Sequence, residues 1–331
     1  MADRISRVIT PQFLQGVALG FSNRTLIADQ LAPVITVNKD RGQYRIFGKN
    51  ELLVHEARWA YGAIPNAIDY RWSSDTFFSE PRKLRIKLLD AEVRNADGDL
   101  DLRRSYTRVV TNAILIAREK RVSDLFTTAG NYPGGNVVTK GGGSEWDTVA
   151  AGTPTIIRTD LDAAIRQVTI GGIIPRSEVT IVIPEPVYDQ VVRFNATFLA
   201  SITPTSQDSV GPDMLARYFG VKQVLIAPVM TTGPGPEVAN SDVVTGFTAT
   251  YLWGDNVWVG VVATGQDDMQ PTFARSFNWK ADTGGQLRQI RQYRFDDEGA
   301  EADWIECKEN MGEKITFSGA GYLIKNTLST I

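Results

Sequence analysis

The chain contains 331 residues, 43% of them hydrophobic, and carries a formal net charge of −3 at pH 7. This length exceeds the usual size of a single hydrophobic core, so it predicts two linked cores together with extended arms. The near-neutral charge argues against a protein that binds nucleic acid through its bulk electrostatics. Cys307 is the only cysteine, which excludes an intrachain disulfide and fits a reducing compartment.

The first 32 residues are expected to form an arm rather than part of a core. Their apolar run, residues 17–21, is too short for the hydrophobic part of a signal peptide or for a membrane span. A short amphipathic piece follows and stops at Pro33. We therefore expect a protein that is made and used without export by a signal peptide and without contact with a membrane.

From Val34 the apolar residues recur with a period of two, which is typical of strands. A turn at residues 39–42 leads into a second alternating segment around Tyr44 and Ile46, and this pattern indicates a hairpin. Alternation returns over residues 68–78. Together these segments predict a long two-stranded loop, which cannot bury its own faces and therefore needs a neighbour.

The longest unbroken pattern predicts a helix over residues 99–127, preceded by a short helix within residues 79–98. Asp99 or Asp101 can cap the long helix, and the glycine-rich sequence from Gly130 ends it. Apolar residues at steps of three and four form a stripe that should face another layer: Leu102, Tyr106, Val109, Ala113, Ile116 and Ala117, widened by Val110 and Ile114 and extended by Leu125. The basic residues fall mostly off this stripe.

Residues 154–265 alternate helices with buried strands, which predicts a compact α/β unit. We expect helices over residues 155–168, 186–194 and 213–219, and strands over residues 178–183, 221–227 and 257–263.

From Pro271 to the end the pattern is almost purely that of antiparallel strands with one solvated face. Turns are expected at residues 281–285, at residues 296–299, and at Met311 and Gly312. Such a sheet is the expected partner for the apolar stripe of the long helix.

Taken in order, these segments resemble the major capsid proteins of tailed bacteriophages, which share the Hong Kong 97-type fold. The resemblance spans nearly the whole chain and is carried by several stretches in combination: ADQLAPVITVNKDRGQYRIFGK, LLDAEVRNADGDLDL, AREKRVSDLFTTAGNYPGG, LARYFGVKQVLIA, FARSFNW and GYLIKN. It implies an α+β fold with an N-terminal arm, an extended β-hairpin E-loop, a peripheral domain with a long spine helix and a β-sheet, and an α/β axial domain.

On this resemblance the chain divides into five segments: the arm (1–32), the E-loop (33–78), the peripheral domain with its spine helix at 99–127 (79–153), the axial domain (154–265) and further peripheral strands (266–331). The implied function is the head shell of a tailed double-stranded DNA phage. Hexamers and pentamers of the chain would close into an icosahedral container around the genome. The shell would belong to the virion and be assembled in the host bacterial cytoplasm.

The resemblance also implies partners. These are further copies of the chain, a separate scaffolding protein, a portal protein and a maturation protease, with DNA enclosed but not bound by sequence; a decoration protein is a further candidate. Scaffolding is expected to be separate because the family prototype carries a long cleaved segment before the arm, whereas this sequence begins almost at the arm. Lys39, Lys49 and Asn50 lie in the loop, but the prototype's cross-linking residues do not map onto matching positions, so no cross-linking is predicted.

The sequence offers little chemistry for an enzyme. His55 is the only histidine, which leaves no histidine pair for a metal and no Ser/His/Asp or Cys/His arrangement, so a surface or contact role is expected for it. Cys307 shares the face of Ile305 and is expected to be a small core residue. Glu185 follows a strand, as a catalytic carboxylate could, with Asp189 four residues on, but a turn acid near a helix start is the preferred interpretation.

Two further motifs have ordinary interpretations. The glycines at residues 141–143 lack the Lys-Ser/Thr of a phosphate-binding loop and are expected to form a flexible loop. The acids at residues 267–268 and 296–298 lack the ligand spacing of a calcium loop and are expected in solvated turns. We therefore predict no catalytic, cofactor-binding or metal-binding residues.

Contacts between subunits are the predicted functional sites. The aromatic residues of the loop are expected to anchor them: Trp59, Tyr61, Tyr70 and Trp72. For the spine arginines, ion pairs between subunits or within the fold are preferred over DNA binding: Arg103, Arg104, Arg108, Arg118 and Arg121. Two alternatives stay open, namely an encapsulin-type nanocompartment shell that holds cargo protein, and a soluble α/β enzyme that uses Glu185 and Asp189.

Overall fold

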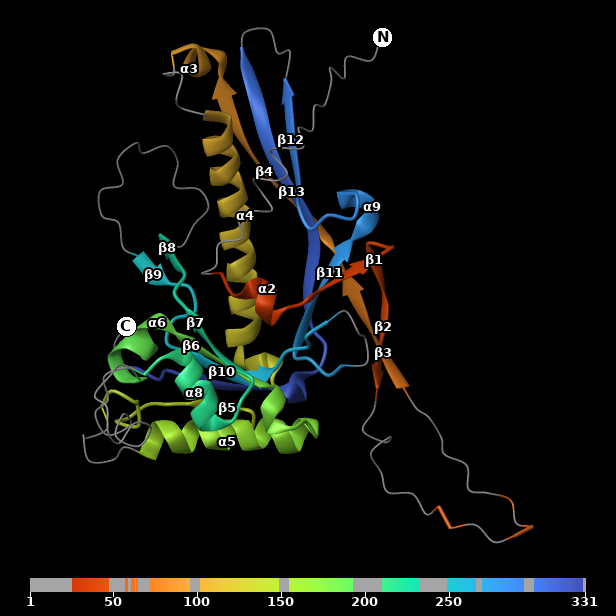
Figure 1. Cartoon of the computed structure of the whole chain (residues 1–331), viewed down its shortest axis with the longest axis vertical. Coiled ribbons are helices and arrows are strands. Elements are labelled where there is room, and N and C mark those ends of the chain that lie inside the picture. Colours follow the sequence, from red (N-terminus) through yellow and green to blue (C-terminus); the bar gives the residue numbers. More distant parts are fainter. Residues whose placement is uncertain are drawn as a thin grey trace.

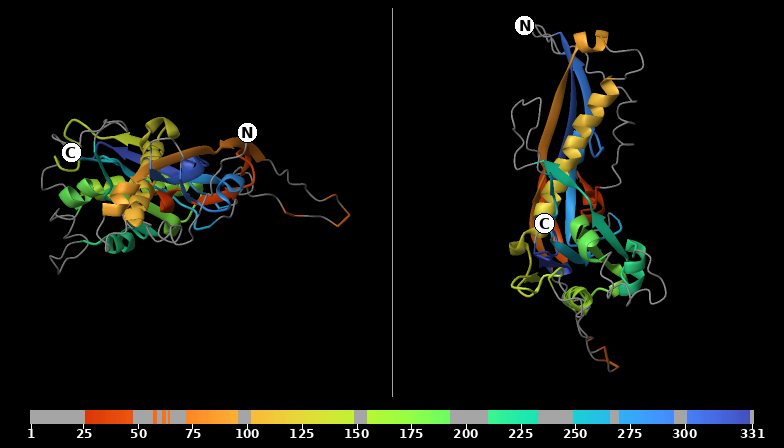
Figure 2. Two further views of the ribbon diagram at one scale, coloured as in Figure 1. Left: turned by 90° about the horizontal axis from the view of Figure 1, so that it is seen from above. Right: turned by 90° about the vertical axis from the view of Figure 1, so that its left-hand side faces the viewer.

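The computed structural model describes residues 26–47, 57–58, 61–62, 64, 72–95, 102–148, 155–192, 210–232, 249–265, 270–294 and 301–329. Two five-stranded sheets form the body of the molecule. Figure 1 shows that the first sheet and helix α4 (Leu102–Thr127) run side by side along the long axis, and that the second sheet lies at one end. The side view in Figure 2 places α3 (Asp90–Asn95) at the opposite end.

The first sheet is built on one long strand, β13. Its five strands are β1 (Val34–Val37), β4 (Glu80–Leu89), β11 (Ala274–Trp279), β12 (Gln289–Arg294) and β13 (Ala302–Ile315). Strand β4 pairs antiparallel with β13 on one side, while β12 and β11 pair antiparallel with successive parts of its other side. Strand β1 adds to β11 in parallel.

Strand β4 overturns the short helix predicted within residues 79–98, of which only α3 is helical. The helix was predicted from the spacing of Leu84 and Leu88, but four residues is also twice the period of a strand. Ile86 completes the alternation with lysine and arginine between the apolar positions. Pairing with β13 along the whole of β4 decides in favour of the strand.

One predicted turn and one predicted hairpin of the first sheet are also wrong. Met311 and Gly312 lie inside β13, and glycine is needed there because a Cβ on Gly312 would lie 1.8 Å from the carbonyl oxygen of Phe78. Strand β1 forms no hairpin with the segment after residues 39–42, because it pairs with β11 instead. The chain at Phe78 therefore lies directly against β13, and β1 lies directly against β11.

Helix α4 confirms the long helix, but its buried face differs from the predicted stripe. Val109 is 57% exposed, and Ala113 and Ala117 are exposed as well. The buried residues are Thr107, Val110, Thr111, Ile114, Leu115, Arg118, Glu119, Val122, Ser123 and Phe126. Half of these are polar, and a hydrophobicity pattern misplaces a face that carries buried polar groups.

The second sheet has the order β5-β14-β10-β6-β7. Its strands are β5 (Val137–Thr139), β6 (Val179–Pro184), β7 (Gln223–Ala227), β10 (Val257–Val261) and β14 (Gly321–Lys325). The helices predicted around it are confirmed as α5 (Thr155–Gly172) and α8 (Pro212–Phe219), while the predicted middle helix is described as α6 (Glu185–Val187) followed by a π-helical turn, η4 (Tyr188–Val192).

Strand β14 belongs to this second sheet, contrary to the expectation that the strands after Pro271 form one antiparallel sheet. The segment is buried on both faces, as a central strand must be, whereas the other C-terminal strands carry charged residues. The domain boundaries themselves stay predictions.

The remaining elements are short. Strands β2 (Arg41–Phe47) and β3 (Trp72–Phe78) pair antiparallel along their whole lengths, which confirms the two-stranded loop over its described part. The others are α2 (Ala28–Leu31), η2 (Ala129–Asn131), η3 (Arg176–Glu178), β8 (Met230–Thr232), β9 (Ala249–Tyr251), α9 (Lys280–Thr283) and η5 (Ser318–Ala320). Among the described helices, none is long and apolar enough to cross a membrane.

Candidate assembly elements

Strands β2 and β3, here called the ribbon, extend beyond the edge of the first sheet (Figure 1). Phe77 of the ribbon stacks on Phe277 of β11, with ring centroids 4.5 Å apart and planes inclined by 9°. Gly42 opposite permits this packing, because a Cβ there would lie 2.9 Å from the Phe77 ring. The base of the ribbon is therefore held by an aromatic contact that only a small neighbour allows.

Polar contacts reinforce the same base. The hydroxyl of Tyr44 donates to Asp75 at 3.0 Å, and Asp75 lies 2.7 Å from the ammonium of Lys314 at the end of β13. The hydrogen bond from Lys314 lowers the pKa of Asp75, whereas burial and the nearby carboxylate raise that of Tyr44. Contacts on two sides thus fix the direction in which the ribbon leaves the sheet.

Apolar side chains are exposed in the ribbon and in the segment between its two strands. Phe78 at the base is 47% exposed, whereas Tyr61 and Ile64 between the strands are 98% and 94% exposed. Trp72 opens β3 opposite Phe47. The other predicted anchors, Trp59 and Tyr70, lie outside the described residues, as do His55, Lys49 and Asn50.

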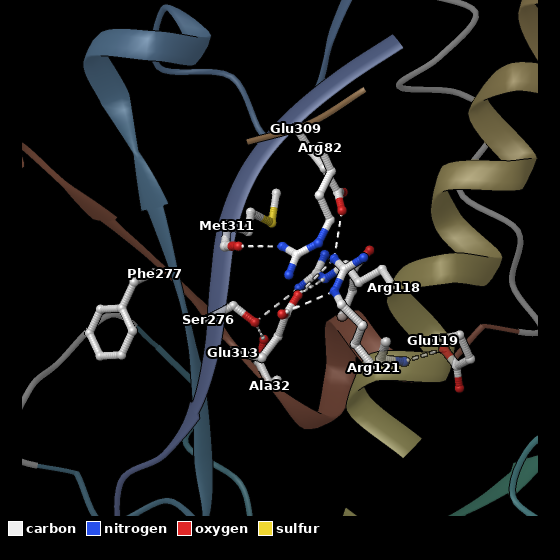
Figure 3. A network of polar contacts seen from close by, with 12 residues as sticks. Ala32, Arg82, Arg118, Glu119, Arg121, Ser276, Phe277, Glu309, Met311 and Glu313 are labelled. Atoms are coloured by element: carbon white, nitrogen blue, oxygen red, sulfur yellow. Dashed lines mark hydrogen bonds and ion pairs between the residues drawn. The ribbon is translucent and has the colours of Figure 1, made fainter. Parts of the chain in front are cut away.

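Charged side chains gather where α2, α4 and β13 meet (Figure 3). This cluster, here called the junction, consists of Asp29, Arg118, Glu119, Arg121, Arg288, Glu309 and Glu313. Arg121 donates to Glu309 at 2.6 Å and to Glu313 at 3.0 Å. Arg118 donates to Asp29 of α2, and Arg288 lies 3.5 Å from Glu309.

The junction is buried. The side chains of Arg118 and Glu309 are 1% and 0% exposed, and Glu313 is 6% exposed. Burial and the charge of Arg118 lower the pKa of Arg288. A buried ion pair adds little net stability compared with apolar packing, but removing one partner leaves a charge uncompensated at a cost of about 3–5 kcal/mol. The junction therefore fixes α2 and α4 against β13.

Glu119 completes the junction on the side of the second sheet. Its carboxylate accepts hydrogen bonds from the backbone N–H groups of Ile27 and Ala28 at 3.1 and 2.8 Å, and from the indole of Trp253 at 2.9 Å. Burial raises the pKa of Glu119, although these three hydrogen bonds oppose the increase. Phe126 lies near Trp253 in the same core, so one helix joins the start of the described chain to both sheets.

The five spine arginines separate into two groups. Arg118 and Arg121 form ion pairs within the junction, and a role of the spine arginines in assembly stays a prediction. Arg103 lies 3.3 Å from Asp303 at the surface, and Arg104 and Arg108 are exposed. Only the second group is placed where a neighbouring subunit could reach it.

Sequence reasoning missed the acidic half of the junction. None of Glu119, Asp29 and Glu309 was singled out from the sequence. The adjacent pair Arg118-Glu119 lies on the helix face that also carries Ile114 and Val122, which was the one available signal that these charges are buried.

The candidates for enzyme chemistry that the structure describes lie in different settings. Cys307 is 1% exposed, as expected for a core residue, and burial raises the pKa of its thiol to about 12. Glu185 opens α6 and Asp189 lies in the following π turn; burial and their charges raise the pKa of Tyr251. Within the described ranges, no group of three or more histidine, cysteine or acidic residues could hold a metal ion.

The glycines at residues 141–143 lie in a loop, as predicted, with the N–H of Gly143 donating to Glu145. The acids at residues 267–268 and 296–298 fall outside the described residues.

No protein-family model matches the chain. It is 26% identical over 260 residues to the major capsid protein of Pseudomonas phage JBD67, covering 74% of this chain and 83% of that protein. It is also 26% identical over 268 residues to the major capsid protein of Burkholderia phage BcepMu, covering 80% of each. By sequence, therefore, its relatives are shell proteins of phages.

Solved structures agree. A phage-related protein from Bordetella bronchiseptica RB50 superimposes with a TM-score of 0.71 at 18% identity, covering 97% of this chain and 98% of that one. The capsid protein of cyanophage P-SCSP1u gives a TM-score of 0.60 at 13% identity, covering 98% and 92%. By sequence and by fold, this chain is similar to phage major capsid proteins. The expected Hong Kong 97-type α+β fold is confirmed, and a capsid protein has a structural role as part of a virion.

Proposed function

We propose that this capsid protein builds the head shell of a tailed double-stranded DNA phage, in which hexamers and pentamers of the chain close into an icosahedral container. The similarity to two phage major capsid proteins carries the proposal. Both named relatives are phage proteins, which favours the phage shell over a nanocompartment that encloses cargo protein. The enzyme alternative rests on Glu185 and Asp189 alone, and we propose no catalytic role for the chain.

The marginal stability of the ribbon and the apolar surface that it exposes support a role in assembly. A two-stranded ribbon is marginally stable alone in water, and this one is anchored at its base while its further residues expose apolar surface. Such an element gains stability by lying on a neighbouring subunit, so that folding is completed by association. We propose that its aromatic residues are anchors of this contact: Trp59, Tyr61, Tyr70 and Trp72.

The exposed arginines at the other end of α4 are proposed as a second contact. Arg103, Arg104 and Arg108 lie along the first two turns of the helix and can reach carboxylates of an adjoining subunit. Arg118 and Arg121 are not included, because their ion pairs belong to the junction, whereas the pair of Arg103 with Asp303 lies at the surface.

We further propose that a scaffolding protein, a portal protein and a maturation protease act with this chain during assembly in the host bacterial cytoplasm. The enclosed DNA is proposed to be held without sequence-specific binding, in keeping with a net charge of −3. A decoration protein is a further candidate partner on the outer face.

Sedimentation and electron microscopy of the purified protein test the proposal. Alone or with its scaffolding protein, the chain is expected to form species far heavier than its 36.5 kDa, with closed shells in micrographs. A monomer at every salt and protein concentration, with scaffolding present, would contradict the proposal. Shells that capture one cargo protein and exclude DNA would favour the nanocompartment instead.

A further inference from the structure

A hollow lined by arginines separates α5 from the C-terminal end of α8, which lie beside each other in Figure 1. It consists of two adjoining parts of about 540 and 320 Å³ that share three lining residues. We call it the α5–α8 groove. Its charged and aromatic lining comprises Arg158, Asp162, Arg166, Arg176, Arg217 and Tyr218.

One aspartate faces four arginines in this groove. Arg176 donates to Asp162 at 2.5 Å and also to the carbonyl oxygen of Phe219, where it closes the last turn of α8. Arg158 lies 3.7 Å from Asp162 and over the ring of Tyr218, 5.6 Å from its centroid. Two arginines therefore already neutralise Asp162.

Arg166 and Arg217 supply the surplus charge. Both are exposed, and neither forms an ion pair with any residue that the structure describes. On α5, Arg158 and Arg166 flank Asp162 at intervals of four, so all three project from the same face of the helix. Arg217 enters from the last turn of α8. Like charges gathered in this way repel one another unless an anion lies between them.

We propose that the α5–α8 groove binds the phosphate groups of a polyanion. The planar guanidinium presents paired donors that match the oxygens of a phosphate, and several such forks can hold successive groups. The size of the groove falls within the range of about 300–1,000 Å³ that ligand sites occupy, and it exceeds what one phosphate needs. Backbone phosphates carry no base identity, so this binding is independent of sequence.

The polyanion that a head shell encloses is DNA, so we take the DNA backbone as the source of the phosphate groups. This part of the inference rests on the proposed function. The chain as a whole is acidic, so a local excess of arginine is needed for any contact with the genome. A few phosphate contacts per subunit give weak, salt-sensitive binding, which is compatible with loading and release of the DNA.

The test compares two double variants with the native protein. Arg166→Gln with Arg217→Gln removes the two arginines of the groove that have no described acidic partner. Lys39→Gln with Lys87→Gln is the matched control, because it removes the same charge from exposed lysines between β1 and β2 and in the first sheet. Binding of a short fluorescent DNA duplex is followed by anisotropy over a series of salt concentrations, with inorganic polyphosphate and inorganic phosphate as competitors.

For the groove variant, we expect the slope of log affinity against log salt to fall by about 1.8, at about 0.9 for each lost contact. The control is expected to change little. Displacement of the duplex by polyphosphate supports the phosphate chemistry, and binding of polyphosphate without binding of duplex would assign the groove to free polyphosphate.

Equal DNA binding by both variants would overturn the proposal. If the groove variant instead keeps its DNA binding but loses its shells in sedimentation, the arginines hold carboxylates of a neighbouring copy. Thermal melting of the same samples identifies any loss of folding. Failure of the native protein to form shells under every condition would count against the proposed function, while the comparison of the variants would still decide the chemistry of the groove.

Discussion

The junction and the ribbon are the two regions that depend most on distant parts of the chain, and they differ in where their partners lie. In the junction, buried charges such as Glu309 have partners within the same subunit. The ribbon packs on the first sheet at its base, and Tyr61, in the segment between its two strands, is 98% exposed.

This difference separates the residues that hold the subunit together from those that we propose to join subunits. A charge in the junction that loses its partner remains buried in a low-dielectric region, so damage there should appear as unfolding. Loss of an exposed aromatic residue beyond the base of the ribbon should leave the two sheets intact, so damage there should appear as failed assembly. The following predictions run from the largest expected effect on subunit stability to the smallest.

The largest effect is expected from Ile114→Pro in the middle of α4. An interior proline costs about 3 kcal/mol or more, and here it would also displace the helix face that packs on the first sheet and carries the junction. Soluble protein should be abolished, as measured by expression yield and far-ultraviolet dichroism. Ala113→Ser, at an exposed position of the same turn, is the control and should melt like the native protein.

The second prediction concerns Arg121→Met, which leaves Glu309 and Glu313 short of a partner. We expect a loss of about 3–5 kcal/mol in the free energy of unfolding, measured by urea denaturation of unassembled subunits. The double variant Arg121→Met with Glu309→Met should recover part of this loss, because it removes the uncompensated charge as well. Strictly additive losses would show that these two residues do not act as a pair.

The third prediction is a pH dependence from Glu119. Because its folded-state pKa is raised, its contribution to stability is fully present below the unfolded pKa of 4.5 and is lost as pH rises through the folded pKa. The melting temperature of the native protein minus that of Glu119→Gln should therefore increase as the pH is lowered from neutral toward 4.5. A constant difference across the series would mean that Glu119 does not titrate as inferred.

The smallest effect on the subunit is expected from Trp59→Ala combined with Trp72→Ala in the ribbon segment. Thermal melting and dichroism should stay close to those of the native subunit, while sedimentation should show that shells no longer form. Each aromatic anchor typically contributes about 2 kcal/mol or more at a well-packed contact, and the loss recurs at every subunit. Global unfolding would place these tryptophans in an intrachain core, and normal shells would remove the ribbon from the contact.

The spacing of apolar residues predicted an element correctly where a single period explains all of its apolar positions. Helix α5 and strand β6 have regular apolar patterns and appear where the sequence indicated them. Strand β4 was misread because its spacing of four fits both a helix and a strand, and only its distant partner β13 distinguishes them. Local patterns thus decide the type of an element when a single period explains the apolar positions.

The junction could not be predicted because its partners are far apart in the sequence. Arg121 and Glu309 are separated by 188 positions, and nothing local shows that an arginine on a helix will meet a buried glutamate. Gly312 offers a similar lesson, since its role depends on the approach of Phe78 from another strand. The exposure of the arginines at the start of α4, in contrast, could be predicted from the helical pattern alone.

Strand β13 has a mechanical consequence. The base of the ribbon is tied to its last residues through Lys314, and its first residues reach the far end of the first sheet. Tension between these points acts parallel to the strands, so it loads the hydrogen bonds between β4 and β13 in shear, and these must break together. Tension across the sheet would instead peel β12 away one bond at a time. A subunit of this kind should resist stretching along its length far better than opening at its edge.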